Sequence, residues 1–207
     1  MIKALLPNQL KVQIKIALRF VKDLCSGHLF RFAKANSVKD KFSFEISRTQ
    51  DFKPSSTLDS KIFNLKKASQ KVSSVLIEPE QIFSFWNIVG SPTHKNGFQS
   101  GRTIVEGELS ETIGGGLCQL SGLIYYLSLE AGLIIIERHN HSVDLYNEET
   151  RYTPLGSDAT VVYGYKDLLI KNPYTFPIYF DFIITNQEIS IFLRSEKKIR
   201  KNLVEFS

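Results

Sequence analysis

The cysteine at position 118 stands in the sharpest chemical pattern of the 207-residue chain, Gly114-Gly115-Gly116-Leu117-Cys118-Gln119. Consecutive glycines allow a backbone with positive φ or a close approach to another segment. The apolar spacing that follows predicts a helix over 117–131, with Gly132 placed to end it. A thiol in the first turn of a helix is favoured as thiolate, and the free N–H groups there can hold an oxyanion. The alternative interpretation is a packing turn with a buried, inert thiol, because cysteine is among the most often buried residue types.

Histidines and aspartates downstream supply further groups for a cysteine-dependent site. An apolar strand is expected over 133–137, and His139-Asn140-His141 follows it, with Asp144 next. Asp158 lies in Gly156-Ser157-Asp158-Ala159-Thr160, before a strand expected to open at Val161. Transglutaminase-like and papain-like cysteine enzymes use the same order of a helix-borne Cys, a strand-associated His and an orienting third residue. This is an analogy at the level of fold.

The roles within this cluster follow from alternation along an extended chain. His139 and His141 would point to opposite faces, so one of them can meet Cys118. We assign the base to His141, because Ser142 and Val143 continue into what the pattern predicts to be a strand. Arg138 can clamp a substrate carboxylate or form a structural ion pair. The residues expected to contact the substrate are Gly115, Gly116, Gln119, Arg138 and His139.

Zinc is an alternative for the same cluster, because His, Cys and Asp are all zinc-ligand types. A His-x-His pair on one strand holds its rings apart, however, and no second cysteine is near Cys118. We therefore expect no metal and no other cofactor.

The N-terminal region predicts an amphipathic helix over 9–25 with a basic stripe of Lys11, Lys15, Arg19 and Lys22. This helix either packs on the domain with a solvated basic face or lies on an anionic membrane surface. Residues 1–40 contain eight Lys or Arg and two Asp, a balance of +6, whereas the whole chain is +5. The remainder thus sums to −1, which argues against a nucleic-acid partner. Cys25, at the helix end, is expected to be a small apolar filler.

The compartment is inferred from cysteine usage and from hydropathy. The two cysteines lie far apart and form no C-x-x-C pair, which favours a reducing environment. We find neither a run of about 20 apolar residues nor a secretory h-region. A cytoplasmic location is expected, with peripheral contact at the inner face of the membrane if residues 9–25 bind there.

Several short motifs in a fixed order carry a family resemblance. They are Glu78-Pro79-Glu80-Gln81-Ile82-Phe83-Ser84-Phe85, Val89-Gly90, Asn96-Gly97-Phe98, the Cys118 turn, Glu137-Arg138-His139-Asn140-His141-Ser142, Pro154-Leu155-Gly156-Ser157-Asp158-Ala159-Thr160-Val161, and Lys166-Asp167-Leu168 with Asn172. Over about residues 58–195 the chain resembles the VanW family, named for a component of B-type glycopeptide-resistance clusters in bacteria. The family pattern usually has glycine where this chain has Glu80. Asp158 lies in the more family-like motif, so we prefer it to Asp144 as the orienting residue.

Together these patterns predict an α+β fold. An antiparallel sheet, with strands over 41–48, 167–170, 177–185 and 188–194, is expected to pack on the Cys118 helix and on a helix over 62–72. We expect a basic helical segment at 1–40 and a VanW-like domain at 41–200. Two function classes follow: a cysteine-dependent amidase, peptidase or transpeptidase acting on a cell-wall-related peptide, or a non-catalytic module that binds a wall precursor or a partner protein at the membrane.

Overall fold

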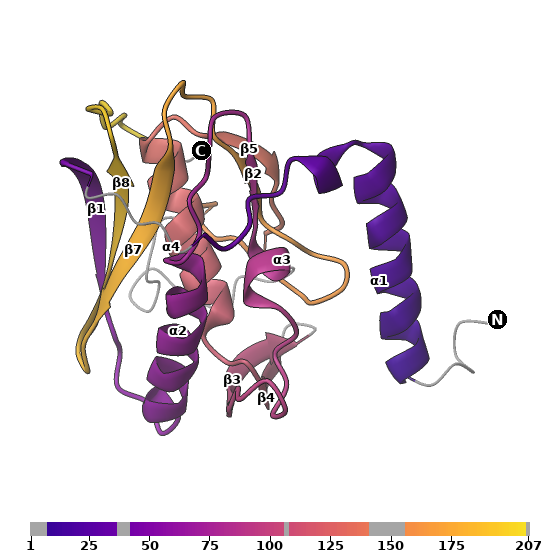
Figure 1. The fold of residues 1–207 in the computed structure, drawn as a ribbon. Coiled ribbons are helices and arrows are strands. Elements are labelled where there is room, and N and C mark those ends of the chain that lie inside the picture. The colour runs from indigo at the N-terminus through magenta and orange to yellow at the C-terminus, as the bar shows by residue number, and fades with distance from the viewer. Residues whose placement is uncertain (1–7, 37–41, 106–107, 141–155, 206–207) are drawn as a thin grey trace.

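The computed structural model describes residues 8–36, 42–105, 108–140 and 156–205 (Figure 1). The α+β class expected from the sequence is confirmed, because helices pack on separate antiparallel sheets. The main sheet has the order β1-β8-β7, formed by Phe44–Asp51, Glu188–Ser195 and Ile178–Ile184. In its register Phe44 lies opposite Ser195, and Ile184 lies opposite Ile189.

Two further sheets flank the helices. The order β2-β6-β5 joins Ile82–Ser84, Leu169–Lys171 and Ile134–Glu137, and β3 (Ser100–Val105) forms a hairpin with β4 (Glu108–Ile113). The short helix α3 (Phe85–Val89) follows β2 directly. β5 and β6 lie where strands were expected, over 133–137 and 167–170, whereas the elements of 82–113 were not predicted from the sequence.

Helix α4 (Leu117–Glu130) lies at the centre of the molecule, beside α2 (Leu58–Val72) and against the main sheet (Figure 1). Most of its residues are buried all round rather than along one stripe, which is typical of a core helix. Leu120, Ile124 and Leu127 are fully buried there and meet the inner face of β8, where Ile189, Ile191 and Leu193 are equally inaccessible. The fold thus fixes the start of α4, and with it Cys118, against a rigid core.

The turn before β2 has the left-handed backbone conformation that glycine favours, although a glutamate occupies it. Glu80 has φ 64°, a left-handed conformation that L residues seldom adopt. Its N–H donates to Asn172 O, and Asn172 N–H donates to Gln81 O, so the turn is tied to the strand that pairs with β2. The family pattern has glycine at this position, and the geometry explains why.

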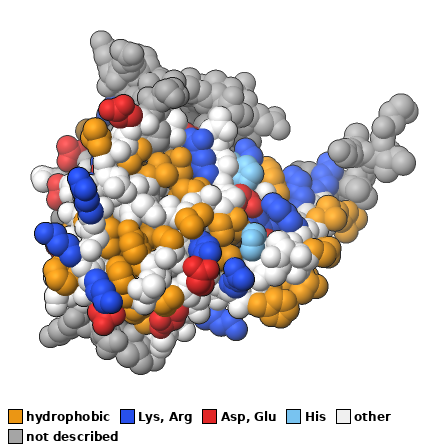
Figure 2. All heavy atoms as spheres, turned by 90° about the horizontal axis from the view of Figure 1, so that it is seen from above, with side chains coloured by type: hydrophobic (Ala, Val, Ile, Leu, Met, Phe, Trp, Pro, Cys, Tyr) orange, Lys and Arg blue, Asp and Glu red, His pale blue; other side chains and the backbone are white. Residues whose placement is uncertain are grey.

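Helix α1 (Asn8–Cys25) projects from the side of the molecule and is followed by a short 3₁₀ turn, His28–Phe30 (Figure 1). The helix contacts the domain through Arg19, which binds Glu137, whereas most of its large apolar residues are exposed, so its apolar face is not the packing surface. Figure 2 shows hydrophobic side chains gathered on this part of the surface. Cys25 is exposed too, so it does not fill the core as expected.

Candidate functional site

The glycine turn before α4 is held rigidly by its neighbours. Gly114 and Gly116 have φ of 91° and 98°, and a Cβ added to Gly116 would lie 2.8 Å from Lys61 Cγ. Asn64, fully buried on α2, donates to Gly115 O at 3.1 Å and to Gln99 O at 2.9 Å. Gly114 and Gly116 are therefore required by packing and by backbone conformation, and they fix the position of the helix start.

Cys118 is the second residue of α4 and is half-buried against the main core. Its thiol donates a hydrogen bond to Val161 O, with a sulfur-to-oxygen distance of 3.7 Å. None of the hydrogen bonds within the described residues uses the Cys118 N–H. The Cys118 N–H lies at the positive end of the helix.

The segment 158–161 runs beside the first two turns of α4. Ser121 Oγ donates to Ala159 O at 2.6 Å, and a Cβ added to Gly122 would lie 3.9 Å from Asp158 Cα. On the other side, Thr160 N–H donates to His139 O at 2.7 Å. Three regions singled out in the sequence, the Cys118 turn, the Asp158 motif and the His139 segment, thus lie side by side. The strand expected to open at Val161 is absent from the described residues there, where one isolated bridge joins Val162 to Lys166.

Arg138 binds the Asp158 segment itself. Its guanidinium donates to Asp158 O at 2.8 Å, to Gly156 O at 2.7 Å and to Asp158 Oδ1 at 3.0 Å. Of the two roles considered for Arg138, the structural ion pair is the one observed. The role of Asp158 in orienting a histidine stays a prediction, because His141 lies outside the described residues, as does Asp144.

The remaining predicted substrate-binding side chains are engaged inside the protein. The His139 ring lies 3.0 Å from Glu137 Oε1, measured from Nε2. Gln119 Nε2 donates to Gln50 Oε1 on β1 at 2.9 Å. Gln119 Oε1 and Thr160 Oγ1 are buried and have no hydrogen-bond partner among the described residues, so they are unpaired polar atoms close to Cys118.

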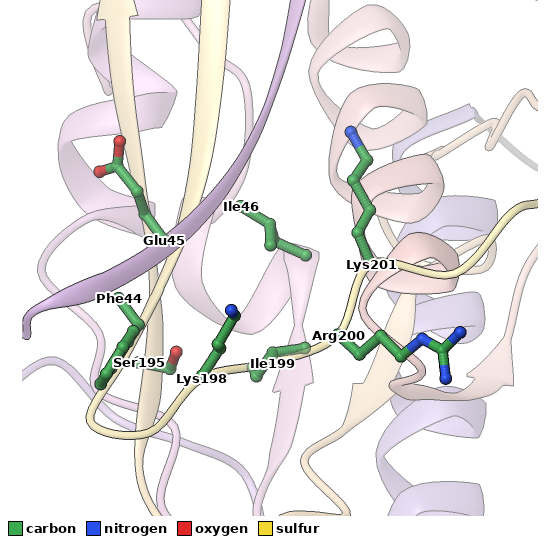
Figure 3. Close-up of a pocket in the computed structure, with 8 residues that line it drawn as sticks. All are labelled: Phe44, Glu45, Ile46, Ser195, Lys198, Ile199, Arg200 and Lys201. Atoms are coloured by element: carbon green, nitrogen blue, oxygen red, sulfur yellow. The ribbon is translucent and has the colours of Figure 1, made fainter.

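A pocket of about 580 Å³ lies elsewhere, between the start of β1 and the chain that follows β8 (Figure 3). Its lining is rich in cations, with Lys198, Arg200 and Lys201 around it. Lys201 also pairs with Glu130 at the C-terminal end of α4, 3.3 Å away. Twelve residues of helix, roughly 18 Å, separate that end from Cys118, and none of the residues predicted for the site lines this pocket.

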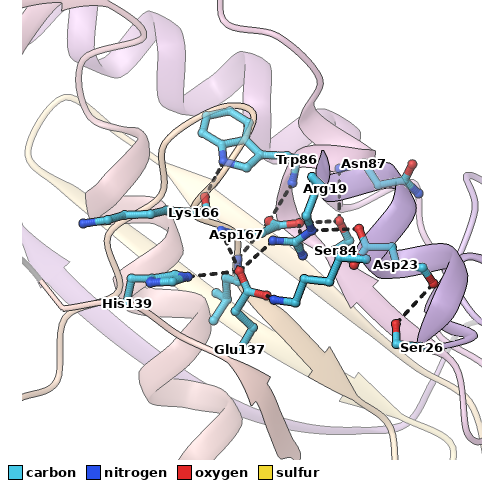
Figure 4. Close-up of polar contacts among 12 residues, drawn as sticks. Arg19, Asp23, Ser26, Ser84, Trp86, Asn87, Glu137, His139, Lys166 and Asp167 are labelled. Atoms are coloured by element: carbon cyan, nitrogen blue, oxygen red, sulfur yellow. Dashed lines mark hydrogen bonds and ion pairs between the residues drawn. The ribbon is translucent and has the colours of Figure 1, made fainter. Parts of the chain in front are cut away.

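A cluster of buried charges that the sequence analysis missed lies on the other side of His139 (Figure 4). Arg19 of α1 donates to Asp23 Oδ2 and to Glu137 Oε1, each at 2.7 Å, and its Nη2 lies 3.7 Å from Asp167 Oδ2. Asp167 also accepts from Ser84 Oγ at 2.7 Å and from the Trp86 N–H at 3.0 Å. Arg19 thus meets Asp23 of its own helix and joins α1 to two carboxylates from the family motifs, Glu137 and Asp167.

Glu137 and Asp167, the two carboxylates of this cluster that lie outside α1, have opposite pKa shifts. Burial raises the pKa of Asp167 to about 6, although hydrogen bonds from Ser84 and Trp86 oppose the shift. Burial also acts to raise the pKa of Glu137, but hydrogen bonds from His139 and Arg19 outweigh it and lower that pKa to about 2. Separated pKa values in a buried cluster mark a functional-site candidate, and structural ion pairs produce them as well.

The sequence contained a signal for this cluster. Glu137 and Asp167 both stand in the motifs that carried the resemblance, next to apolar residues that the structure buries. Their convergence depends on the pairing of β5 with β6, which places Glu137 opposite Leu169. Arg19 reaches them from a helix more than a hundred residues earlier, a contact that no local pattern predicts.

Within the described ranges, no three His, Cys, Asp or Glu side chains are grouped as ligands of a metal ion. The zinc alternative included His141, which those ranges do not contain. None of the helices described is long and apolar enough to cross a bilayer.

Residues 60–194 match a protein family described as VanW like protein. The chain belongs to the VanW family. The match confirms the resemblance carried by the short motifs, and it includes Cys118, Glu137, Asp158 and Asp167.

Two curated VanW relatives are each 36% identical to the chain. One is the "Vancomycin B-type resistance protein VanW" of Enterococcus faecalis (strain ATCC 700802 / V583), matched over 114 residues, 55% of this chain and 42% of that protein. The other is the "Uncharacterized protein YoaR" of Bacillus subtilis (strain 168), matched over 119 residues, 58% of this chain and 38% of that protein. The chain thus spans about two fifths of the length of these relatives. No solved structure matches it.

Proposed function

We propose that this VanW-family chain is a cysteine-dependent acyl-transfer enzyme centred on Cys118. The observation that supports the proposal is the contact between the first turn of α4 and the segment 158–161, with His139 on the far side of that segment. His141, the histidine assigned as base, follows His139 by two residues in the sequence. These three regions would supply the thiol, the base and the orienting carboxylate that such a mechanism requires.

The reaction would proceed in two steps, acylation of Cys118 and then attack on the thioester. His141 would take the thiol proton, and the Cys118 sulfur would add to an amide carbonyl carbon of the substrate. The oxyanion would be held by the Cys118 N–H at the helix start, and the C–N bond would break as the amine leaves with the proton from His141. Water or a second amine would then attack the thioester and release the thiol, giving hydrolysis or transpeptidation. The arrangement of Cys, His and Asp would follow that of transglutaminase-like and papain-like enzymes.

The substrate class comes from the relatives. The name of the Enterococcus faecalis protein links it to vancomycin B-type resistance. A peptide of the cell wall, or a precursor of one, is the amide-bearing substrate that we propose for this chain. The unpaired Gln119 Oε1 would serve as an acceptor for it beside the thiol.

A non-catalytic role is the second candidate, and a specific observation favours it. The Cys118 thiol donates to Val161 O, and the Asp158 carboxylate is held by Arg138, so both groups have structural partners. In this alternative the rigid glycine turn and its unpaired neighbours form a binding site for a wall precursor or a partner protein.

Thiol labelling distinguishes the two candidates, and the chain contains its own control. Cys25 is exposed and Cys118 is half-buried, so accessibility alone makes Cys25 react faster with iodoacetamide. An activated thiolate would reverse this order in the native protein. Faster modification of Cys118, measured by peptide mass spectrometry and lost in Cys118→Ser, is the expected result. Slower modification of Cys118 contradicts the enzyme and leaves the binding role.

Titration of the thiol tests the assigned base. His141→Ala should raise the apparent pKa at which Cys118 becomes reactive, and Asp158→Asn should raise it less. His139→Ala is the matched control, because its ring lies against Glu137 rather than in the proposed site. If none of the three substitutions moves the titration, the acyl-transfer mechanism is wrong.

A further inference from the structure

Helix α1 is attached to the rest of the protein by its polar side. Asp23 is buried beneath it, and Arg19, with its side chain 14% exposed, binds Glu137 of β5. Val12 and Ile16, 39% and 36% exposed, contact the Gly164 turn on the same side, where a Cβ added to the glycine would lie 3.1 Å from Ile16 Cγ1. We call the surface formed by Val12, Ile16, Arg19 and Asp23 the inner face of α1.

The opposite side of the helix is apolar and uncovered in the described structure. Six large apolar side chains there are between 39% and 64% exposed, namely Leu10, Ile14, Leu18, Phe20, Val21 and Leu24. At about 3.6 residues per turn they form one contiguous surface, which we call the outer face. The usual arrangement of an amphipathic helix on a globular domain is thus inverted, because the apolar side points outward. An exposed apolar surface of this extent on one helix indicates an interaction site.

The charges around the outer face are of one sign. Asp23 is the only acidic residue in α1, and it is buried on the inner face at 5% exposure. Lys11 and Lys15 follow one border of the outer face, and Lys22, 64% exposed and paired with Glu137 Oε2 at 3.1 Å, extends the same line. Residues 1–40 carry a net charge of +6, whereas the remainder is close to neutral.

The apolar outer face and its lysine border together indicate which partner the helix binds. A second copy of the chain packed antiparallel through the same face would bring two lysine borders together, and like charges oppose that contact. An anionic lipid surface satisfies both features, because acyl chains accept the apolar side chains and phosphates attract the lysines. An 18-residue helix is about 27 Å long and lies flat in such an interface.

We propose that the outer face of α1 binds the surface of an anionic lipid bilayer, with the helix parallel to the membrane plane. The inner-face ion pairs with Glu137 and Asp167 would then hold the VanW-family region close to the lipid headgroups. Phe30, 82% exposed in the turn after α1, would extend the apolar contact. The proposal does not depend on the chemistry proposed for Cys118.

Vesicle flotation of the full chain tests the proposal. We expect binding to vesicles of equal phosphatidylglycerol and phosphatidylcholine, weakening as salt is raised, and little binding to phosphatidylcholine alone. The double variant Leu18→Asp with Val21→Asp should lower binding to the acidic vesicles at least about tenfold. Phe63→Asp is the matched control: Phe63 is 45% exposed on α2, and its substitution should leave binding unchanged.

Lys11→Glu separates the charge contribution from the apolar one, and it should lower binding at low salt more than at high salt. Circular dichroism of each variant verifies that the fold is retained, as expected for exposed positions. The proposal is overturned by equal binding to neutral and acidic vesicles, by no binding, or by an equal loss in Phe63→Asp. A lipid-free homo-oligomer that Leu18→Asp with Val21→Asp dissociates would also overturn it, in favour of a second copy.

Discussion

Replacing Asp167 by asparagine removes a carboxylate that the fold buries at an energetic cost. Asp167 accepts hydrogen bonds from Ser84 Oγ, from the Trp86 N–H and from the Leu168 N–H. Arg19 Nη2 lies 3.7 Å away, at the edge of ion-pair range. These contacts only partly offset desolvation, so the folded-state pKa is raised from 3.8 to about 6. The charged form of Asp167 is therefore less favourable in the folded protein than in the unfolded chain.

The magnitude follows from the size of the shift. About two pKa units correspond to about 3 kcal/mol of unfolding free energy. Because the folded pKa is raised, this stabilisation is fully present below pH 3.8 and is lost as the pH rises through about 6. The wild-type protein should therefore gain about 3 kcal/mol relative to Asp167→Asn between about pH 7 and about pH 4. Glu137 acts in the opposite direction, because the stability contributed by its lowered pKa is lost as the pH falls from 4.5 towards about 2. Both proteins contain Glu137, so its contribution cancels in the comparison.

Urea denaturation at a series of pH values measures this difference, with the fluorescence of the single tryptophan, Trp86, as the probe. Asp181→Asn is the control, since Asp181 is a half-exposed carboxylate on β7 paired with Arg194 at 3.2 Å. The free-energy difference between wild type and Asp167→Asn should depend on pH, with a slope centred between pH 3.8 and about 6. Parallel profiles for the two proteins over that range would refute the reasoning, as would a difference of opposite slope.

Three substitutions test the backbone and the ion pairs. Glu80→Gly should raise the free energy of unfolding by about 1 kcal/mol, because relief of the positive φ exceeds the lost surface pair with Lys171; an unchanged urea midpoint would show that the turn is unstrained. Gly116→Ala should lower it by at least about 2 kcal/mol, since the new methyl group meets Lys61 in a left-handed backbone, and wild-type thermal stability would contradict this. Arg19→Met should lower the free energy of unfolding by about 3 kcal/mol near neutral pH, because it leaves buried carboxylates uncompensated. A loss below about 1 kcal/mol in urea titrations would show that solvent replaces the arginine.

Local patterns predicted the long elements of the fold well. The helix expected over 117–131 is observed as α4, and Gly132 has the positive φ of a helix end. The last two strands, expected over 177–185 and 188–194, are β7 and β8 within one residue at each end. Alternating apolar residues bounded by the turn at Asn186 were sufficient there, because one face of each strand is buried.

Short and non-local elements were predicted less well. Residues 74–77 have the residue types of a strand but form only isolated bridges, Ala35 with Val75 and Ile77 with Ile178. Tyr163 and Tyr165 alternate with Gly164 as strand residues would, but they flank a turn. In both cases the residue types suit a strand, but the tertiary partner decides whether a ladder forms.

In the candidate site too, spacing along the chain predicted some features, whereas long-range contacts were not predicted. Cys118 at the start of α4 and the nearby Asp158 motif follow from spacing along the chain. The engagement of Arg138 with Asp158, and of His139 with Glu137, depends on which segments the fold brings together. The direction in which α1 presents its apolar side depends on one long-range arginine, and periodicity alone cannot assign it.

The pairing of β1 with β8 sets the minimal piece of this chain that can fold cleanly. The family match begins at residue 60, whereas β1 covers β8 along the full length from Phe44 to Asp51. A fragment cut at the family boundary would convert β8 from a central strand into an edge strand, with its backbone donors and acceptors unpaired. Such an edge is a template for addition of strands from other molecules, and aggregation is the usual outcome. The cooperative unit is therefore larger than the family region, and a recombinant VanW fragment needs the upstream strand to stay monodisperse.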